Sequence, residues 1–189
     1  WYGEEKPDFK GAEFADGAYT AKMSYTSDYL GRMNYITYPD GETVSYSYDA
    51  GGQVTKVTGE RNGVETVYIA KIGYDEYGQR SFIEYGNGVK TSYTYDENRR
   101  WLDSIKTLSA TDRILQNMNY TFDKVGNVLG YENTSSNYTT KQNYQYDSLY
   151  QLVEAKGETE YKPHWNYDKE DPHTYISTYE QSFRFDNIG

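Results

Sequence analysis

An aromatic residue followed by Asp recurs through this sequence, and it constrains the fold more than any other feature. The Asp residues lie 18 to 27 residues apart. Self-similarity at a nearly fixed period is typical of repeat architectures. We therefore predict that one structural unit is repeated about eight times. The pairs are Tyr48-Asp49, Tyr74-Asp75, Tyr95-Asp96, Phe122-Asp123, Tyr146-Asp147, Tyr167-Asp168 and Phe185-Asp186, and a degenerate copy precedes them at Asp28.

The residues around each pair predict a strand followed by a turn. Two residues before the aromatic stands another apolar or aromatic side chain, for example Tyr46, Tyr93 or Tyr120. This period-two pattern is typical of a strand with one apolar face. Three residues after the Asp, five of the eight copies have Gly, and Asp-x-x-Gly is a turn signature. These glycines are Gly31, Gly52, Gly78, Gly126 and Gly189, whereas the other copies have Arg99, Tyr150 and Asp171.

A second turn divides each repeat into two strands. Apolar residues five and eight positions after the Asp, such as Val54 and Val57, indicate a second strand, and their odd offset predicts a β-bulge or a twist in that strand. Asp40-Gly41 and Asn62-Gly63 are then hairpin signals. The sequence thus predicts an all-β meander of antiparallel β-hairpins, in which the stretch from Leu108 to Leu115 could form a short helical insertion.

The composition supports an ordered β protein. Leu, Ile, Val and Phe account for only 30 of 189 residues, and the net charge is −10. Such values are typical of disordered chains. The 24 tyrosines counter that interpretation, because tyrosine favours strands and buries a large apolar ring while its hydroxyl stays near water.

Charge and residue usage exclude several classes of function. An acidic chain lacks the basic surface that nucleic acids require, so we expect no nucleic-acid partner. The chain has no Cys, which excludes disulfides and thiol catalysis. We expect no membrane span, since no apolar run reaches about 18 residues. No signal peptide is visible, and the absence of an initiator Met suggests a fragment.

Residues 28–59 carry a family resemblance. They contain Asp28-Tyr29-Leu30-Gly31-Arg32-Met33, then Tyr38-Pro39-Asp40-Gly41, then Tyr46-Ser47-Tyr48-Asp49. This order closely resembles the YD repeat of the RHS family, which includes RHS polymorphic toxins, shell subunits of insecticidal toxin complexes and teneurins. The resemblance covers roughly residues 25–189, which we interpret as about eight repeats with the last one truncated. Residues 1–24 are interpreted as a linker or a divergent repeat.

The resemblance implies an architecture and a role. Members of this family wind YD repeats into a β-sheet spiral that closes, in bacterial members, into a hollow shell around a C-terminal toxin domain. We therefore expect a fragment of a larger shell, with a structural and non-catalytic role. The expected partners are neighbouring repeats of the parent chain and an enclosed toxin domain, and the expected location is secreted or at the cell surface. An alternative function is a cell-surface adhesion or carbohydrate-binding module that binds glycan through its tyrosines.

Three sets of side chains are candidate sites. The repeated Asp residues could bind calcium, but one carboxylate per turn favours a turn cap over a calcium loop. The tyrosine rows could stack on sugars, but the repeat favours cross-strand packing. The densest titratable cluster could bind zinc, act as acid and base in a hydrolase, or be a polar loop; it comprises His164, Asp168, Glu170, Asp171 and His173. No nucleophile motif is present, and we predict no metal, cofactor or enzymatic activity.

Overall fold

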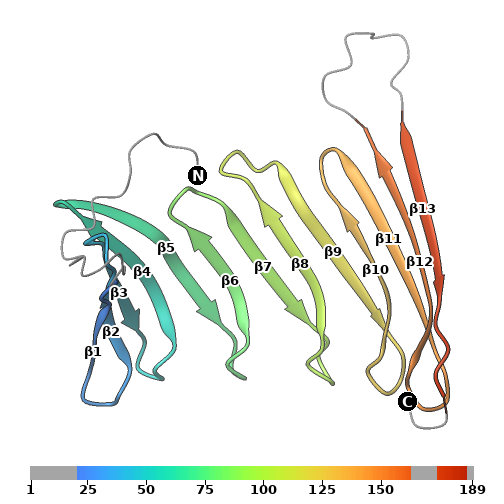
Figure 1. The fold of residues 1–189 in the computed structure, drawn as a ribbon, viewed down its shortest axis with the longest axis horizontal. Helices are drawn as coiled ribbons and strands as arrows, with labels where there is room; N and C mark the ends of the chain where they lie inside the picture. Colours follow the sequence, from blue (N-terminus) through green and yellow to red (C-terminus); the bar gives the residue numbers. More distant parts are fainter. Residues whose placement is uncertain (1–20, 163–173, 187–189) are drawn as a thin grey trace, which may run out of the picture. The chain divides into compact units, whose positions relative to one another are not determined.

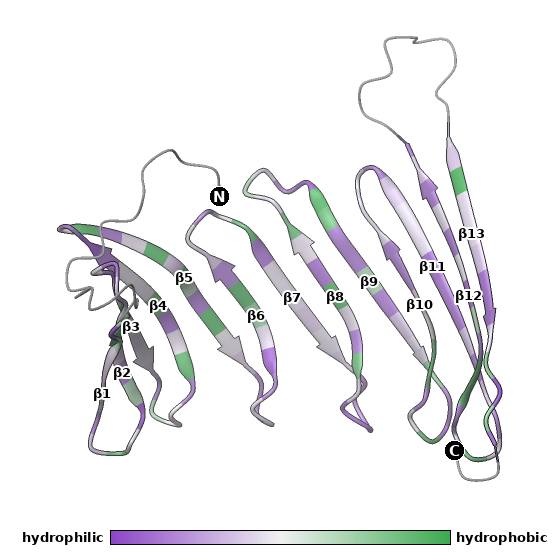
Figure 2. Ribbon diagram, viewed as in Figure 1, coloured by the Kyte–Doolittle hydropathy of each residue, from purple (hydrophilic) through white to green (hydrophobic). Residues whose placement is uncertain are grey.

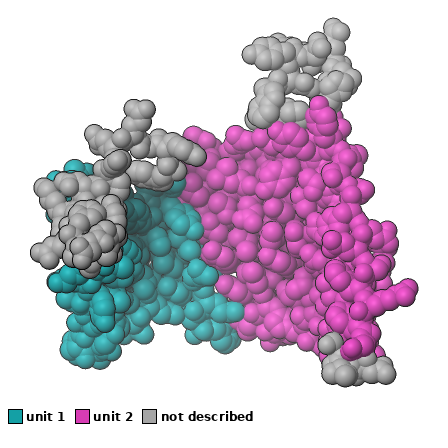
Figure 3. All heavy atoms as spheres, viewed as in Figure 1, with its two compact units in different colours: residues 1–88 teal, residues 89–189 magenta. Residues whose placement is uncertain are grey.

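The described part of the chain is built from antiparallel β-strands. The computed structural model describes residues 21–162 and 174–186. These residues form thirteen strands and divide between two compact units, residues 1–88 and 89–189 (Figure 3). The expected all-β class with antiparallel hairpins is confirmed. No helix long and apolar enough to cross a membrane is present in residues 21–162 and 174–186.

The first unit is a six-stranded antiparallel meander (Figure 1). Each strand pairs with the next one along the chain. The strands are β1 (Ser24–Ser27), β2 (Met33–Thr37), β3 (Thr43–Tyr48), β4 (Val54–Arg61), β5 (Val64–Tyr74) and β6 (Arg80–Tyr85). Hydrophobic positions along β5 are interrupted by hydrophilic ones (Figure 2), as expected for a sheet that buries one face.

The second unit is a seven-stranded meander of the same kind. Its strands are β7 (Lys90–Tyr95), β8 (Leu102–Leu108), β9 (Ile114–Phe122), β10 (Val128–Thr134), β11 (Tyr138–Tyr146), β12 (Leu152–Tyr161) and β13 (Tyr175–Ser182). The helical insertion expected from Leu108 to Leu115 is wrong. Leu108 ends β8 and pairs with Ile114 at the start of β9, so the segment is a hairpin turn.

A β-bulge follows each Asp turn of the described repeats, so of the two alternatives that the odd spacing of apolar residues predicted, the bulge is the one observed. In the β3–β4 hairpin Tyr48 pairs with Val54 and Ser47 with Lys56, so Thr55 is the extra residue. The bulge turns Val54 and Val57 to the same face of the sheet. The equivalent extra residues are Asn34, Ser81, Asp103, Leu129 and Val153.

The two faces of the second unit differ in charge. The register places the aromatic residues of β7–β13 on one face, which we name the tyrosine face. Charged residues such as Lys141, Lys156 and Glu180 lie on the opposite face, where Lys156 forms ion pairs with Glu154 and Glu180. The tyrosine face carries Tyr93, Tyr95, Tyr120, Tyr131, Tyr138, Tyr144, Tyr146, Tyr161, Tyr175 and Tyr179.

Both units are thinly packed. The buried hydrophobic residues of the described chain are Val44, Ile83 and Ala155, and no described side chain has an exposed fraction below 2%. Stability must therefore come mainly from contacts between adjacent strands within the layer, which raises the importance of the turns and of the side chains that join one repeat to the next.

Candidate functional site: the aspartate turns

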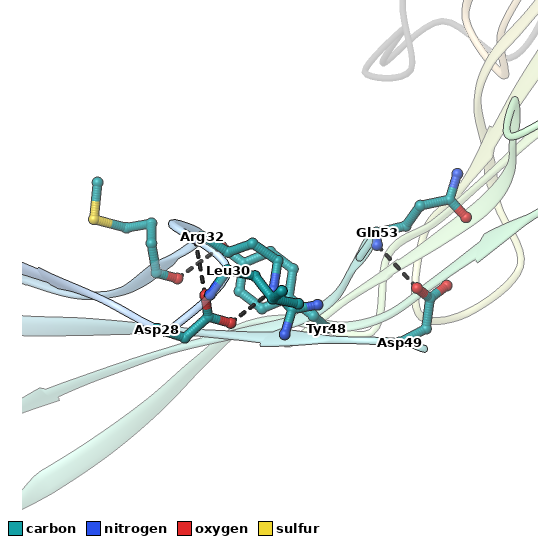
Figure 4. Close-up of polar contacts among 7 residues, drawn as sticks. Asp28, Leu30, Arg32, Tyr48, Asp49 and Gln53 are labelled. Carbon is teal, nitrogen blue, oxygen red and sulfur yellow. Dashed lines mark hydrogen bonds and ion pairs between the residues drawn. The ribbon is translucent and has the colours of Figure 1, made fainter. Parts of the chain in front are cut away.

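The turn at Asp28 defines the local geometry of the repeat (Figure 4). Asp28 Oδ1 accepts hydrogen bonds from the backbone N–H groups of Leu30 and Arg32, at 2.9 and 3.0 Å. Gly31 N–H donates to the Asp28 carbonyl, and Gly31 adopts a φ of 79°. The Arg32 guanidinium adds a 2.7 Å ion pair to Oδ2. The carboxylate thus closes the turn by satisfying donors that β-pairing leaves free.

Four further turns have the same backbone pattern. In each, the Asp N–H donates to the carbonyl four residues later, and that residue's N–H donates back to Asp Oδ1. The carboxyl oxygens accept backbone N–H groups, and this geometry supports the turn-cap interpretation. No group of three or more His, Asp or Glu side chains suited to a metal ion occurs in the described ranges. The four turns begin at Asp49, Asp75, Asp123 and Asp147.

Two turns form without the glycine. At Asp147 the left-handed position is occupied by Tyr150, with a φ of 62°. At Asp96 the turn is one residue longer: Asp96 N–H donates to the Trp101 carbonyl, and Arg100 takes the positive φ of 60°. Arg100, and not Arg99 as the spacing of three residues predicts, therefore occupies the position equivalent to the glycine in this copy.

The tyrosine of the motif joins consecutive repeats. Tyr48 donates its hydroxyl to the carbonyl of Met33, at 2.7 Å. Tyr74 donates to the Val54 carbonyl and Tyr146 to the Val128 carbonyl, both at 2.9 Å. Each acceptor lies five residues after the Asp of the preceding repeat. The hydroxyl therefore satisfies a carbonyl next to the β-bulge, where the ladder is disrupted.

The residue just before the second strand of one repeat also packs on the next repeat. Arg32 lies over the Tyr48 ring, with its Cζ 4.7 Å from the ring centroid. Trp101 takes the equivalent place in the second unit, 5.2 Å from the Phe122 ring. Phe122 has no hydroxyl and therefore cannot form the bond to the carbonyl of the preceding repeat. Ring packing with Trp101 is the contact observed between these two repeats. These contacts were not predicted, because they depend on strand register.

Burial and hydrogen bonding shift the pKa of the turn carboxylates Asp28 and Asp123 in opposite directions. Burial tends to raise the pKa of Asp28, but bonds from the Arg32 side chain and from backbone N–H groups outweigh it, so the pKa is lowered. The pKa of Asp123 is also lowered, since the Asn127 amide and the N–H groups of Val125, Asn127 and Gly126 outweigh burial. Both carboxylates are thus held in the ionised form.

The tyrosine rows pack across strands. The Tyr120 ring centroid lies 6.0 Å from that of Tyr131 and 6.3 Å from that of Phe122. Burial, followed by the neighbouring tyrosines, raises the pKa of Tyr120 and of Tyr144. This arrangement supports the packing interpretation of the rows, because half-buried rings that touch one another offer little free ring surface.

Some predicted positions lie elsewhere. Tyr167, Asp168 and the whole cluster from His164 to His173 fall outside the described residues. Phe185 and Asp186 are described and exposed, and they follow the end of β13, whereas Gly189 falls outside. One turn was missed: Ser109 Oγ accepts the N–H groups of Thr111 and Arg113, and Asp112 takes the positive φ. A Ser-x-x-Asp signal is weak, because both residues are common on surfaces.

The fold and the turns define a class of protein built from tandem β-hairpin repeats. In this class aspartate carboxylates close the turns and tyrosine hydroxyls link consecutive repeats. The family model of the RHS repeat matches residues 28–64. Toxin subunit YenC2 of Yersinia entomophaga is 36% identical over 110 residues, which are 51% of this chain and 11% of the relative. The resemblance to the RHS and YD-repeat family is thereby confirmed.

Solved structures of toxin complexes have the same fold. The crystal structure of TcdB2-TccC3-Cdc42 matches with a TM-score of 0.75 and 28% identity, over 88% of this chain and 9% of that chain. A Tc holotoxin pore of Photorhabdus luminescens matches with a TM-score of 0.72 and 27% identity, over 87% and 8%. The present chain therefore spans about a tenth of the length of the relatives that it matches.

Proposed function

We propose that this chain is a non-catalytic wall segment of an RHS-type shell that encloses or presents a C-terminal toxin domain. In this proposal residues 25–189 form the wall, and residues 1–24 are a linker or a divergent repeat. The protein acts outside the cell or at its surface. The aspartates and aromatics of the motif, including those at 167–168 and 185–186, are structural residues.

The observation that carries the proposal is a hydrogen bond that links one repeat to the next. The same bond, from a tyrosine hydroxyl to the carbonyl five residues after the preceding Asp, recurs at Tyr48, Tyr74 and Tyr146. A contact that recurs from repeat to repeat allows a sheet to grow by the addition of repeats, because each repeat contacts only its neighbours. Similarity to a toxin subunit adds support for a shell. The mechanism is steric: a wall keeps the guest from its target until release.

The test uses the full-length natural protein. Its length and C-terminal domain are established by intact-mass and peptide mass spectrometry, and the C-terminal domain is then probed by limited proteolysis. The proposal expects that domain to survive while the shell is intact. It also expects faster cleavage after Tyr74→Phe with Tyr146→Phe, and no change after Tyr29→Phe, since the Tyr29 side chain is 93% exposed. A C-terminal domain cleaved equally fast in all three proteins contradicts the proposal.

The alternative is a carbohydrate-binding module, favoured by the aromatic and hydroxyl groups of the tyrosine face. Tyr175 and Tyr179 are its most exposed rings, at 59% and 44%. Glycan-array binding that disappears in Tyr175→Ala and Tyr179→Ala would select this function. Absence of any glycan signal for the parent chain would reject it.

A further inference from the structure

The tyrosine face of the second unit holds no formal charge. At the positions of β7–β13 that share this face by register, the side chains are Tyr, Phe, Thr, Ser, Asn, Gln and aliphatic residues. The chain as a whole has a net charge of −10. The charges of these strands, among them Glu132, Lys141, Glu154 and Glu180, lie on the opposite face. One side of the unit is thus a neutral surface on an acidic protein.

This face is packed laterally but not covered within the described residues. Thr91, Gln142 and Ala155 are buried between their neighbours in the layer, with exposed fractions of 5–9%, but the described strands of this unit form a single sheet with no second layer over it. Across it, the Thr140 and Thr159 hydroxyls lie 3.2 Å apart, and Tyr179 bonds to Gln142 over Gly157. These side chains therefore use polar groups on one another, and the rings of Tyr175 and Tyr179 are the most exposed on this face, at 59% and 44%.

We propose that this face pairs with the same face of a second copy of the chain. The pairing is a two-fold symmetric stack of sheets, which places the layers about 10 Å apart. Like charge does not oppose the approach on this face, whereas the charged face carries an excess of carboxylates. The inference is independent of the proposed function, because it concerns the chain of 189 residues by itself.

The available area suits a stable dimer. Seven strands spaced about 4.8 Å apart, with about seven residues each at 3.4 Å, give a surface of roughly 700 Å². Specific interfaces bury about 800 Å² per partner. Tyrosine is enriched in such interfaces, since its ring supplies contact area and its hydroxyl finds a partner across the interface or in trapped water.

Two adjacent residues of β13 with similar exposure, one on each face of the sheet, provide a variant and its control for a test of the dimer. Tyr175 lies on the tyrosine face and Ile176 on the opposite one, and their exposed fractions are 59% and 66%. Sedimentation velocity on the 189-residue chain is expected to give about twice its own mass of 22.0 kDa. Tyr175→Lys should weaken the dimer at least tenfold in Kd, because it places an unpaired charge in the interface. Ile176→Lys should leave the Kd within about twofold.

A second pair avoids large substitutions. Ser177 lies on the tyrosine face and Thr178 on the charged face, and both are exposed. Since the chain has no Cys, Ser177→Cys and Thr178→Cys each give one thiol for alkylation by iodoacetamide. Protection of residue 177 that grows with protein concentration, with residue 178 equally reactive throughout, supports the proposal. A chain that stays monomeric at about 200 μM overturns it, because a Kd above that concentration is too weak for a specific dimer. A dimer that protects residue 178 instead also overturns it.

Discussion

At the scale of single residues, the turn backbone sets a requirement that not every copy of the repeat meets. The left-handed position holds Gly at Gly31, Gly52, Gly78 and Gly126, but Tyr at Tyr150. A side chain with a Cβ costs about 1–2 kcal/mol in this conformation. The Asp147 carboxylate and the flanking strands must therefore hold Tyr150 in place.

Replacing Tyr150 with Gly should stabilise the protein. Tyr150 is 61% exposed, so Tyr150→Gly loses little packing while it removes the backbone strain. We expect a gain of about 1 kcal/mol in the free energy of unfolding, measured by urea titration. Tyr29→Gly is the control, because Tyr29 is an exposed turn residue without positive φ, and Gly there should not stabilise. An equal gain in both variants would mean that the turn strain is not the cause.

The tyrosine hydroxyls should contribute measurably to stability. Tyr74→Phe and Tyr146→Phe each leave a carbonyl, of Val54 or Val128, without its 2.9 Å donor. A bond of this kind contributes about 0.5–1.5 kcal/mol. We expect each variant to lower the urea midpoint accordingly, whereas Tyr29→Phe should not. A neutral result at both sites would show that water replaces the hydroxyl at no cost.

At the scale of strands and turns, much of the fold could be predicted because its signals are local. Period-two alternation and the Asp-x-x-Gly signature each act within a few residues, so the hairpins and their bulges could be placed. The turn at Asp96 could not, since its extra residue is fixed by the pairing of Tyr95 with Leu102. The helix expected near Leu108 failed for the same reason: its apolar residues fit either structure until Leu108 pairs with Ile114.

Contacts between repeats could not be predicted from the sequence pattern. The donor Tyr48 and the acceptor Met33 are 15 residues apart, and their contact depends on the register of two hairpins. The choice of residue is also chemically open, since Arg32 contacts Tyr48 by a cation–π interaction, whereas Trp101 at the equivalent position contacts Phe122 by ring packing. Because a cation or an aromatic ring can serve at this position, the residue type is not fixed from repeat to repeat. A search for a recurring residue type therefore does not find the position.

Glycine within a strand opens room for a tyrosine from a neighbouring strand. Gly157 of β12 lies between Gln142 and Tyr179, and a Cβ there would collide with the Tyr179 ring. Gly157→Ala should therefore cost about 1–3 kcal/mol through overpacking. In a Tyr179→Ser background the cost should fall by at least about 1 kcal/mol, as a double-mutant cycle in urea would measure. Equal costs in the two backgrounds would place the strain in the backbone of β12.

At the scale of the whole molecule, acidic charge is divided between two structural uses. Some carboxylates keep a large β surface soluble, consistent with the net charge of −10. Others are fixed in turns, where the lowered pKa values of Asp28 and Asp123 show that the folded state favours the ionised form. Protonation of Asp28 and Asp123 is therefore linked to folding, because the folded state lowers the pKa of both carboxyls.

Acid should therefore destabilise the fold in a defined window. A carboxyl whose pKa is lower in the folded chain contributes stability above its unfolded pKa, here 3.8, and loses it as pH falls through the folded value. We expect the urea midpoint to drop as pH falls below about 4. Asp123→Asn keeps an oxygen to accept the turn N–H groups but has no charge to titrate, so its midpoint should depend less on pH. Lys124→Ala changes an exposed residue of the same turn, and its urea midpoint should keep the pH dependence of the parent. If the midpoints of Asp123→Asn and the parent depend on pH in the same way, the Asp123 carboxylate does not contribute to acid destabilisation.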